Sequence, residues 1–353
     1  MRSQGLRSPL DDICEALKGH LKLPAGGTVS GFDHVLDEGD IKELPLPGTE
    51  EIPVISAVDG GSNTVLMTPT MAVVLNRVYC NQFLGMKKMD NCEMVEFISK
   101  TEIVEKGGNN FFRTEIYPIE GACPLASIEI DAKDQTLMVG KTYGDLSRAI
   151  SMARRFCEWR VAERAIEAGA ECVIVDGALQ TAFKGESDVA NELYRKAKDA
   201  GSIIAGLSKS TTMYLENGFP IAGTVDMMAK KKGYARWIIG LGRSEEWTHR
   251  ATVYYAKLHE MADRGYRLDV YDGATEEQLE SLLRGLLACS AYFGYPGYPY
   301  PLIDAHTYAR VGSEEAGSLR GQILDRLSAE DAEKLELMER ARASHDVLDS
   351  LGG

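Results

Sequence analysis

Two aspartates in this 353-residue sequence each follow a run of apolar, largely β-branched residues and precede a glycine. Asp59 follows residues 54–58, and Asp176 follows residues 172–175. The runs predict buried strands, and the glycines predict that each strand ends at its aspartate. If the strands are neighbours in one sheet, the two carboxylates converge and can bind a divalent cation. Taken alone, either aspartate is also typical of a turn-forming Asp-Gly pair.

A third acid is expected near these two aspartates. Phosphodiester hydrolysis by two metal ions needs several oxygen ligands, which Mg²⁺ or Mn²⁺ prefers. Residues 143–168 carry the apolar spacing of a helix that precedes the second aspartate strand, and Glu158 lies at the border of that apolar stripe. A salt bridge to Arg154 or Arg155 explains Glu158 equally well, so both interpretations stay open.

Four further side chains could contact a cation or a phosphate. His306 could ligate a metal or carry a proton, and the Tyr298 hydroxyl could hold a phosphate oxygen. Lys209 follows another buried strand and could bind the scissile phosphate as a point charge, with Ser62 as a second donor. Taken singly, a surface histidine, a core tyrosine, an exposed lysine and a turn-capping serine are the simpler interpretations.

The elements that must position these residues follow the order of a ribonuclease H-like fold, with a mixed central β-sheet flanked by helices. In chain order they are an antiparallel hairpin (54–59 and 71–79), a third strand (126–130), a helix (143–168), a strand (172–176), a helix (186–199) and a strand (202–209). Strands that alternate with helices predict parallel pairing. The first aspartate then lies on the first strand and the second on the fourth, both at the sheet centre.

The rest of the chain divides into simpler segments. Residues 1–50 are predicted to form an N-terminal helix and an acidic connector, residues 51–312 the main domain, and residues 313–353 charged C-terminal helices. Residues 85–125 contain a turn at 106–110 and no other clear element. Further elements are strands at 237–241, 251–258 and 266–271, a helix at 276–291 and an aromatic, proline-rich turn at 292–301.

Composition places the chain among ordinary globular proteins, since 44% of its residues are hydrophobic and 26% are charged. No apolar run approaches the roughly 20 residues of a membrane span, so no membrane contact is expected. Seven scattered cysteines without a C-x-x-C pair predict reduced thiols and a cytoplasmic location. The net charge of −14 argues against a protein that coats DNA electrostatically but permits a narrow basic track.

The order of five motifs resembles the NurA nucleases of archaeal and bacterial DNA end processing. The similarity spans residues 50–312 and rests on A-V-D-G-G-S, R-R-F-C-E, V-I-V-D-G-A-L-Q, A-G-L-S-K-S and Y-P-Y-P-L-I-D-A-H. The resemblance implies five catalytic residues, which are Asp59, Glu158, Asp176, Tyr298 and His306. It also implies that all of them except Tyr298 are metal ligands. Two differences from the family pattern are the second glycine after Asp59 and Ala178, where a serine is commoner.

The resemblance also implies an activity and partners. Members look like manganese-dependent enzymes, with Mg²⁺ as a possible substitute, that degrade DNA from the 5′ end and also cut single strands. They act as homodimers with the hexameric HerA translocase in double-strand-break end resection. We therefore expect a DNA nuclease with Mn²⁺ as cofactor, and DNA and a HerA-type ATPase as partners.

Two other functions remain open at this point. A non-catalytic module that binds DNA or a translocase would use the acidic connector and the charged C-terminal helices for protein contact. A phosphate-cradling hairpin of the sugar kinase and actin type would use residues 59–63. That second function normally needs another glycine-rich phosphate loop, for which the sequence offers no convincing match.

Overall fold

A large mixed β-sheet is the centre of the structure, a computed structural model that describes residues 8–21, 23–48, 51–138 and 144–350. Among these residues 12 strands form one sheet, in the order β3-β12-β13-β14-β11-β10-β4-β5-β7-β8-β9, with β6 paired to β5. Their bounds are β3 (Lys42–Glu43), β4 (Val54–Met67), β5 (Met71–Leu84), β6 (Lys87–Lys88), β7 (Glu93–Lys106), β8 (Asn109–Glu120), β9 (Ile128–Asp131), β10 (Cys172–Asp176), β11 (Ile203–Ser208), β12 (Trp237–Arg243), β13 (Ala251–Lys257) and β14 (Tyr266–Tyr271).

The middle of the sheet has the predicted ribonuclease H-like order. β4 and β5 form the opening antiparallel hairpin, and β10 runs parallel to both β4 and β11. Every other strand pair of the large sheet within the described residues is antiparallel, including the pair of β11 with β14. The predicted mixed sheet and the neighbouring positions of the two aspartate strands are therefore confirmed.

One strand assignment from the sequence was misplaced. Residues 126–130 were expected to form the third strand, but they contribute to β9 at the outer edge of the sheet, and β7 pairs with β5 in the third position. The sequence pattern showed no strand between residues 85 and 125, where β7 and β8 form a long hairpin around the predicted turn. The buried positions of β7 alternate but include Ser99 and Thr101, and these polar residues obscure the pattern.

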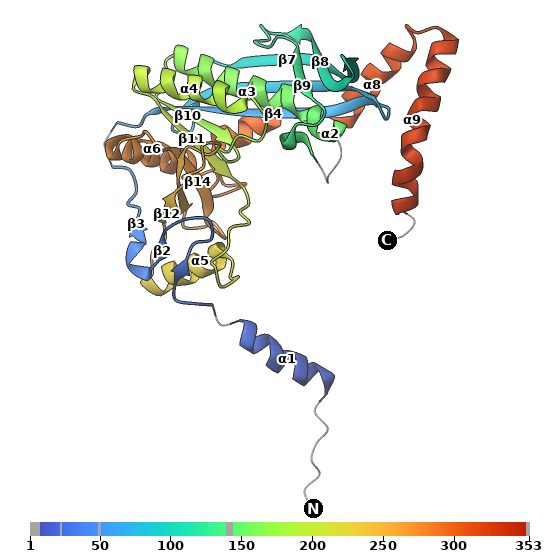
Figure 1. The fold of residues 1–353 in the computed structure, drawn as a ribbon. Helices are drawn as coiled ribbons and strands as arrows, with labels where there is room; N and C mark the ends of the chain where they lie inside the picture. The colour runs from blue at the N-terminus through green and yellow to red at the C-terminus, as the bar shows by residue number, and fades with distance from the viewer. Residues whose placement is uncertain (1–7, 22, 49–50, 139–143, 351–353) are drawn as a thin grey trace, which may run out of the picture.

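Helices cover both faces of the sheet (Figure 1). Val58 and Val173 pack with α3 and α4 on one face, whereas Ala57 and Ile174 pack with α6 and α7 on the other. This follows from the alternation of side chains along a strand. The helices are α1 (Pro9–His20), α2 (Leu146–Ala149), α3 (Ser151–Glu167), α4 (Glu186–Ala200), α5 (Ile221–Lys232), α6 (Glu276–Cys289), α7 (Tyr300–Ala309), α8 (Ser313–Leu324) and α9 (Ala329–Ser350).

The helix predicted over residues 143–168 is divided. Residue 143 lies outside the described residues, α2 ends before Ile150, and α3 then carries the apolar stripe. α3 still connects the hairpin side of the sheet to β10, as predicted. Glu158 therefore lies on a helix that crosses the central strands.

The terminal segments differ in how closely they join the sheet. β3 pairs with β12 at one edge, while β1 (Gly27–Thr28) and β2 (Val35–Leu36) form a separate two-stranded ribbon. α1 stands apart from the rest of the fold (Figure 1). α8 packs against the far end of β4 through Ala316 and Val65. No helix in the described part of the chain is long and apolar enough to cross a membrane.

Candidate metal centre

Asp59 lies inside a long strand, and the prediction that the strand ends there was wrong. β4 continues through the glycine pair to Met67. The neighbouring strand β10 is the one that ends, at Asp176. Its parallel pairing with β4 stops at Val58. Asp59 is thus the first residue beyond the parallel pairing. The two carboxylates meet at that edge, as the sequence predicted.

Asp59, Asp176 and His306 form a compact cluster. One ligand atom from each residue lies within 4.8 Å of the other two. His306 is carried by α7, which packs against β4, and its Nδ1 is 2.8 Å from Asp59 Oδ2. Asp59 is buried, Asp176 is half-buried, and 58% of the His306 side chain is exposed. The cluster is therefore open to solvent on the histidine side.

Two side chains hold Asp176 in place. The buried Tyr298 donates its hydroxyl to Asp176 Oδ1 at 3.1 Å, and Lys209 Nζ donates to Asp176 Oδ2 at 2.6 Å. Both residues were selected from the sequence, and the structure brings both to the cluster. Tyr298 acts by orienting the carboxylate. Lys209 places a positive charge beside Asp176 Oδ2. A cation could take its place there, and a phosphate oxygen could accept its hydrogen bond.

Negative charge at the cluster is only partly balanced. Burial raises the pKa of Asp59, and the nearby Asp176 carboxylate raises it further. Hydrogen bonds with His306 and from the Gly60 N–H lower this pKa without cancelling the increase. A divalent cation would relieve the repulsion between the two carboxylates. Two carboxylates and an imidazole are a donor set that fits Mn²⁺, and Mg²⁺ as an alternative.

Glu158 lies near Asp59 but does not join the cluster in the described part of the chain. Its buried carboxylate forms ion pairs with Arg154 and with Arg155, the latter at 3.5 Å. Burial raises the pKa of Glu158, the two arginines oppose the increase, and Asp59 adds to it. The salt-bridge interpretation therefore describes Glu158 in this structure. Metal binding by Glu158 stays a prediction.

The glycine pair after Asp59 is required by close packing on both faces of β4. A Cβ atom on Gly60 would lie 2.2 Å from Glu158 Oε1. On the other face, a Cβ atom on Gly61 would lie 2.1 Å from the carbonyl oxygen of Ala309, at the end of α7. Gly60 therefore admits the glutamate, and Gly61 admits the helix that carries His306. This gives the second glycine of the motif a physical role.

Ser62 is exposed and lies on β4 three residues after Asp59. Because side chains alternate along a strand, Ser62 points to the face opposite Asp59, the face on which Gly60 borders Glu158. The structure does not bring Ser62 to the cluster. Phosphate binding by this residue stays a prediction.

A buried charged cluster that the sequence interpretation missed supports the loop after β10. Asp269 on β14 accepts a hydrogen bond from the Leu179 N–H at 3.1 Å and lies 2.7 Å from His249 Nε2. Arg267 donates to both oxygens of this carboxylate, at 2.7 and 3.0 Å. Asp269 thus anchors the loop that follows Asp176. The available signal was an aspartate in the middle of a strand that is otherwise largely apolar.

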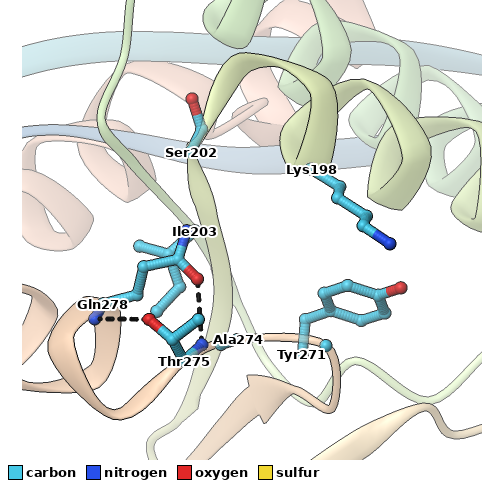
Figure 2. A pocket seen from close by; sticks show the side chains of 8 residues that line it. Lys198, Ser202, Ile203, Tyr271, Ala274, Thr275 and Gln278 are labelled. Carbon is cyan, nitrogen blue, oxygen red and sulfur yellow. Dashed lines mark hydrogen bonds between the residues drawn. The ribbon is translucent and has the colours of Figure 1, made fainter.

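A cavity of about 350 Å³ has none of the cluster residues in its lining. Figure 2 shows the side chains that line it. It is bordered by Ile203 at the start of β11 and by the Thr275 and Gln278 capping box at the start of α6. Leu207 pairs with Asp176, and the four residue steps from Ile203 to Leu207 correspond to about 13 Å of strand. Ligands of open α/β sheets bind at the carboxyl ends of the strands. We therefore assign this cavity no part in the candidate centre.

The fold and the cluster together define a class of protein, an α/β chain of ribonuclease H-like strand order with acidic residues at the sheet centre. Within that class, a family model described as the NurA domain matches residues 53–311, well over half of the chain. The chain belongs to the NurA family. Membership supports a hydrolase of the nuclease type with DNA as substrate.

Solved structures show more distant similarity. The catalytic domain of human endonuclease V is 11% identical, with a TM-score of 0.35 over 77% of this chain and 84% of that domain. Argonaute from Aquifex aeolicus is also 11% identical, with a TM-score of 0.31 over 74% of this chain and 28% of the Argonaute chain. Similarity this low adds no argument about function. Comparison with curated proteins gives no match.

Proposed function

We propose that the chain is a metal-dependent deoxyribonuclease whose catalytic centre is the cluster of Asp59, Asp176 and His306. The observation that supports this most is the incomplete neutralisation of two facing carboxylates, one with a raised pKa, beside a partly exposed histidine. Perturbed acids of this kind are typical of functional sites. The exposed His306 side chain leaves the cluster accessible to a substrate on one side.

Each residue of the centre has a defined task in this proposal. Asp59, Asp176 and His306 hold the cation, preferably Mn²⁺, and Glu158 completes the ligand set from the other face of β4. The bound ion supplies Lewis-acid activation of water and of the phosphoryl group. Tyr298 keeps the Asp176 carboxylate in its ligating orientation. Lys209 transfers its hydrogen bond from Asp176 to the scissile phosphate.

The finer details of the proposed activity follow the motif order and the family. The enzyme degrades single- and double-stranded DNA from 5′ to 3′ and cuts single strands internally. It works as a cytoplasmic homodimer with a HerA-type hexameric ATPase in double-strand-break end resection. The family match over residues 53–311 supports these assignments, because it includes all five motifs.

The test is degradation of DNA labelled at the 5′ or the 3′ end, with Mn²⁺, Mg²⁺ or EDTA. We expect metal-dependent cleavage by the native chain and none by Asp59→Asn. Asp199→Asn is the matched control, because it removes the same charge from an exposed acid on α4, where Asp199 pairs with Arg195. The order in which the labelled products appear gives the polarity.

The competing function is a non-catalytic module that binds DNA or a translocase. Full activity of a folded Asp59→Asn variant would contradict the assigned centre. Absence of cleavage with any metal, by a folded chain that still binds DNA, would instead favour the binding module.

A further inference from the structure

A cavity with a basic lining lies beside the loop that follows Asp176. This cavity has a volume of about 410 Å³ and is bordered by α2, α3 and residues 178–183. Its lining includes Arg148, Arg154 and Arg155, and no carboxylate lines it among the described residues. For a chain with a net charge of −14, three arginines around one cavity are a local reversal of sign.

The three arginines differ in how fully they are occupied. Arg155 is committed to the fold, because it donates to Glu186, Glu158 and the carbonyl oxygens of Ala178 and Gln180. Arg154 uses a single terminal nitrogen, which bonds Glu158 and the Gly60 carbonyl oxygen. An arginine carries five N–H donors, so most of the Arg154 donors have no partner among the described residues.

Arg148 is the residue best placed to bind a ligand. It is exposed at the end of α2, and its guanidinium makes no hydrogen bond or ion pair within the described part of the chain. Ser151, also on the lining, is bonded only to the Arg148 carbonyl oxygen through its hydroxyl. The cavity thus presents a positively charged side chain that has no partner among the residues the structure describes.

The cavity is close to the proposed catalytic centre along two segments of chain. Ala178 lines it and is two residues after Asp176, so their Cα atoms are at most about 7 Å apart. Arg154 binds the carbonyl oxygen of Gly60, the residue next to Asp59. The cavity is therefore within reach of a nucleic acid strand whose scissile phosphate lies at the metal cluster.

We propose that the cavity binds a backbone phosphate of the DNA strand, next to the scissile phosphate, through Arg148 and Arg154. This inference rests on the proposed nuclease function. Guanidinium groups suit the role because their planar fork of donors matches phosphate oxygens. A phosphate held there fixes the register of the strand, because phosphate contacts position a nucleic acid without reading its sequence. Arg148 and Arg154 then belong to the substrate-binding surface and not to the metal site.

The experiment measures binding without catalysis. Fluorescence anisotropy of a labelled oligothymidine is followed in EDTA over a series of salt concentrations, for the native chain and for Arg148→Ala. Each phosphate contact on a single strand contributes about 0.7 to the slope of log K against log salt. We expect Arg148→Ala to lower that slope by about 0.7, which corresponds to roughly fivefold weaker binding at about 0.1 M salt. Gln180→Glu, which adds a carboxylate to the lining, is expected to weaken binding as well.

The control is Arg195→Ala, which removes an exposed arginine from α4 and changes the net charge equally. The inference would be overturned by an unchanged slope for Arg148→Ala or by an equal decrease for Arg195→Ala. It would also be overturned if the native chain did not bind the oligonucleotide at all. The proposed function is tested separately by cleavage with Mn²⁺. Cleavage together with an unchanged Arg148→Ala slope refutes only the phosphate site. A lowered Arg148→Ala slope, found for a chain that does not cleave DNA with any added metal, refutes only the nuclease.

Discussion

Two aspartates of the central sheet, Asp59 and Asp269, each pair with a histidine, and the surroundings of the two pairs are opposite. In the first, His306 Nδ1 is 2.8 Å from Asp59, and the next charged group is the Asp176 carboxylate. In the second, His249 Nε2 is 2.7 Å from Asp269, and the next charged group is the Arg267 guanidinium. The first histidine side chain is 58% exposed and the second only 6%.

The pKa values of the two aspartates record this difference. Burial and Asp176 raise the pKa of Asp59. Burial acts on Asp269 in the same direction, but hydrogen bonds from His249 and Arg267 outweigh it, so the pKa of Asp269 is lowered. The second pair is neutralised within the protein, whereas in the proposed function a cation neutralises the first. A buried acid with too few donors is therefore a better indicator of function than burial alone.

The largest effect expected from this comparison is on stability. Asp269→Asn leaves Arg267 with no carboxylate and removes charge from a network that also holds the Leu179 N–H. Breaking a buried pair in this way costs about 3 to 5 kcal/mol. Asp59→Asn should do the opposite in EDTA and raise the free energy of unfolding, because it removes one of two repelling carboxylates. Urea denaturation of both variants tests the pair of predictions, and equal destabilisation would show that the two sites do not differ.

The two glycines after Asp59 offer a second comparison, between the two faces of β4. Gly61→Ala meets the backbone of α7, which cannot move locally, and overpacking of this kind costs about 1 to 3 kcal/mol. Gly60→Ala meets the end of the Glu158 side chain, which can shift, so we expect a smaller loss of stability but a displaced glutamate. Thermal unfolding should therefore rank Gly61→Ala as the less stable variant, and a slower cleavage rate of Gly60→Ala would report the displaced glutamate.

Gly317→Ala is the control for both glycine variants. Gly317 lies in α8 with open space around its Cα, and alanine in a helix is favoured over glycine by up to about 1 kcal/mol. A Gly61→Ala variant as stable as Gly317→Ala would contradict the close approach of α7 to β4.

The sequence was informative where local pattern and chain order decide the structure. Asp59 and Asp176 could be placed together because apolar runs predict strands, and alternating helices predict that those strands pair in parallel. His306 and Tyr298 came from residue type and motif order, and Lys209 from its position after a buried strand; the structure brings all three to the cluster. The order of the central strands was predicted for the same reason, except for the position taken by β7.

The rest depended on contacts between distant segments. A glycine pair typically ends a strand, and only the approach of Glu158 and Ala309 from opposite faces explains why β4 continues through it. The partners of Glu158 could not be chosen from spacing, because Arg154, Arg155 and a metal were all within reach. Asp269 showed only as an aspartate within a largely apolar strand, and its role could not be read from that pattern because it depends on the loop that Asp269 anchors.

The smallest expected effect is the pH dependence of stability, measured in EDTA. Asp59 has a folded-state pKa above the ordinary 3.8, so its contribution is present below that value and is lost as pH rises through the folded pKa. Asp269 has a folded-state pKa below 3.8, so its contribution is present above 3.8 and is lost as pH falls through the folded pKa. From about pH 3 to pH 7, the native chain should therefore lose stability relative to Asp59→Asn and gain it relative to Asp269→Asn.

Circular dichroism melting of the three proteins at several pH values measures these two differences. Mn²⁺ added at neutral pH should stabilise the native chain and Asp269→Asn but not Asp59→Asn, because a ligand that binds only the folded state stabilises it by mass action. If the two differences changed with pH in the same direction, the contrast between the two aspartates would be lost. If Mn²⁺ stabilised Asp59→Asn as strongly as the native chain, the cation would bind elsewhere, and the uncompensated charge at Asp59 would need another explanation.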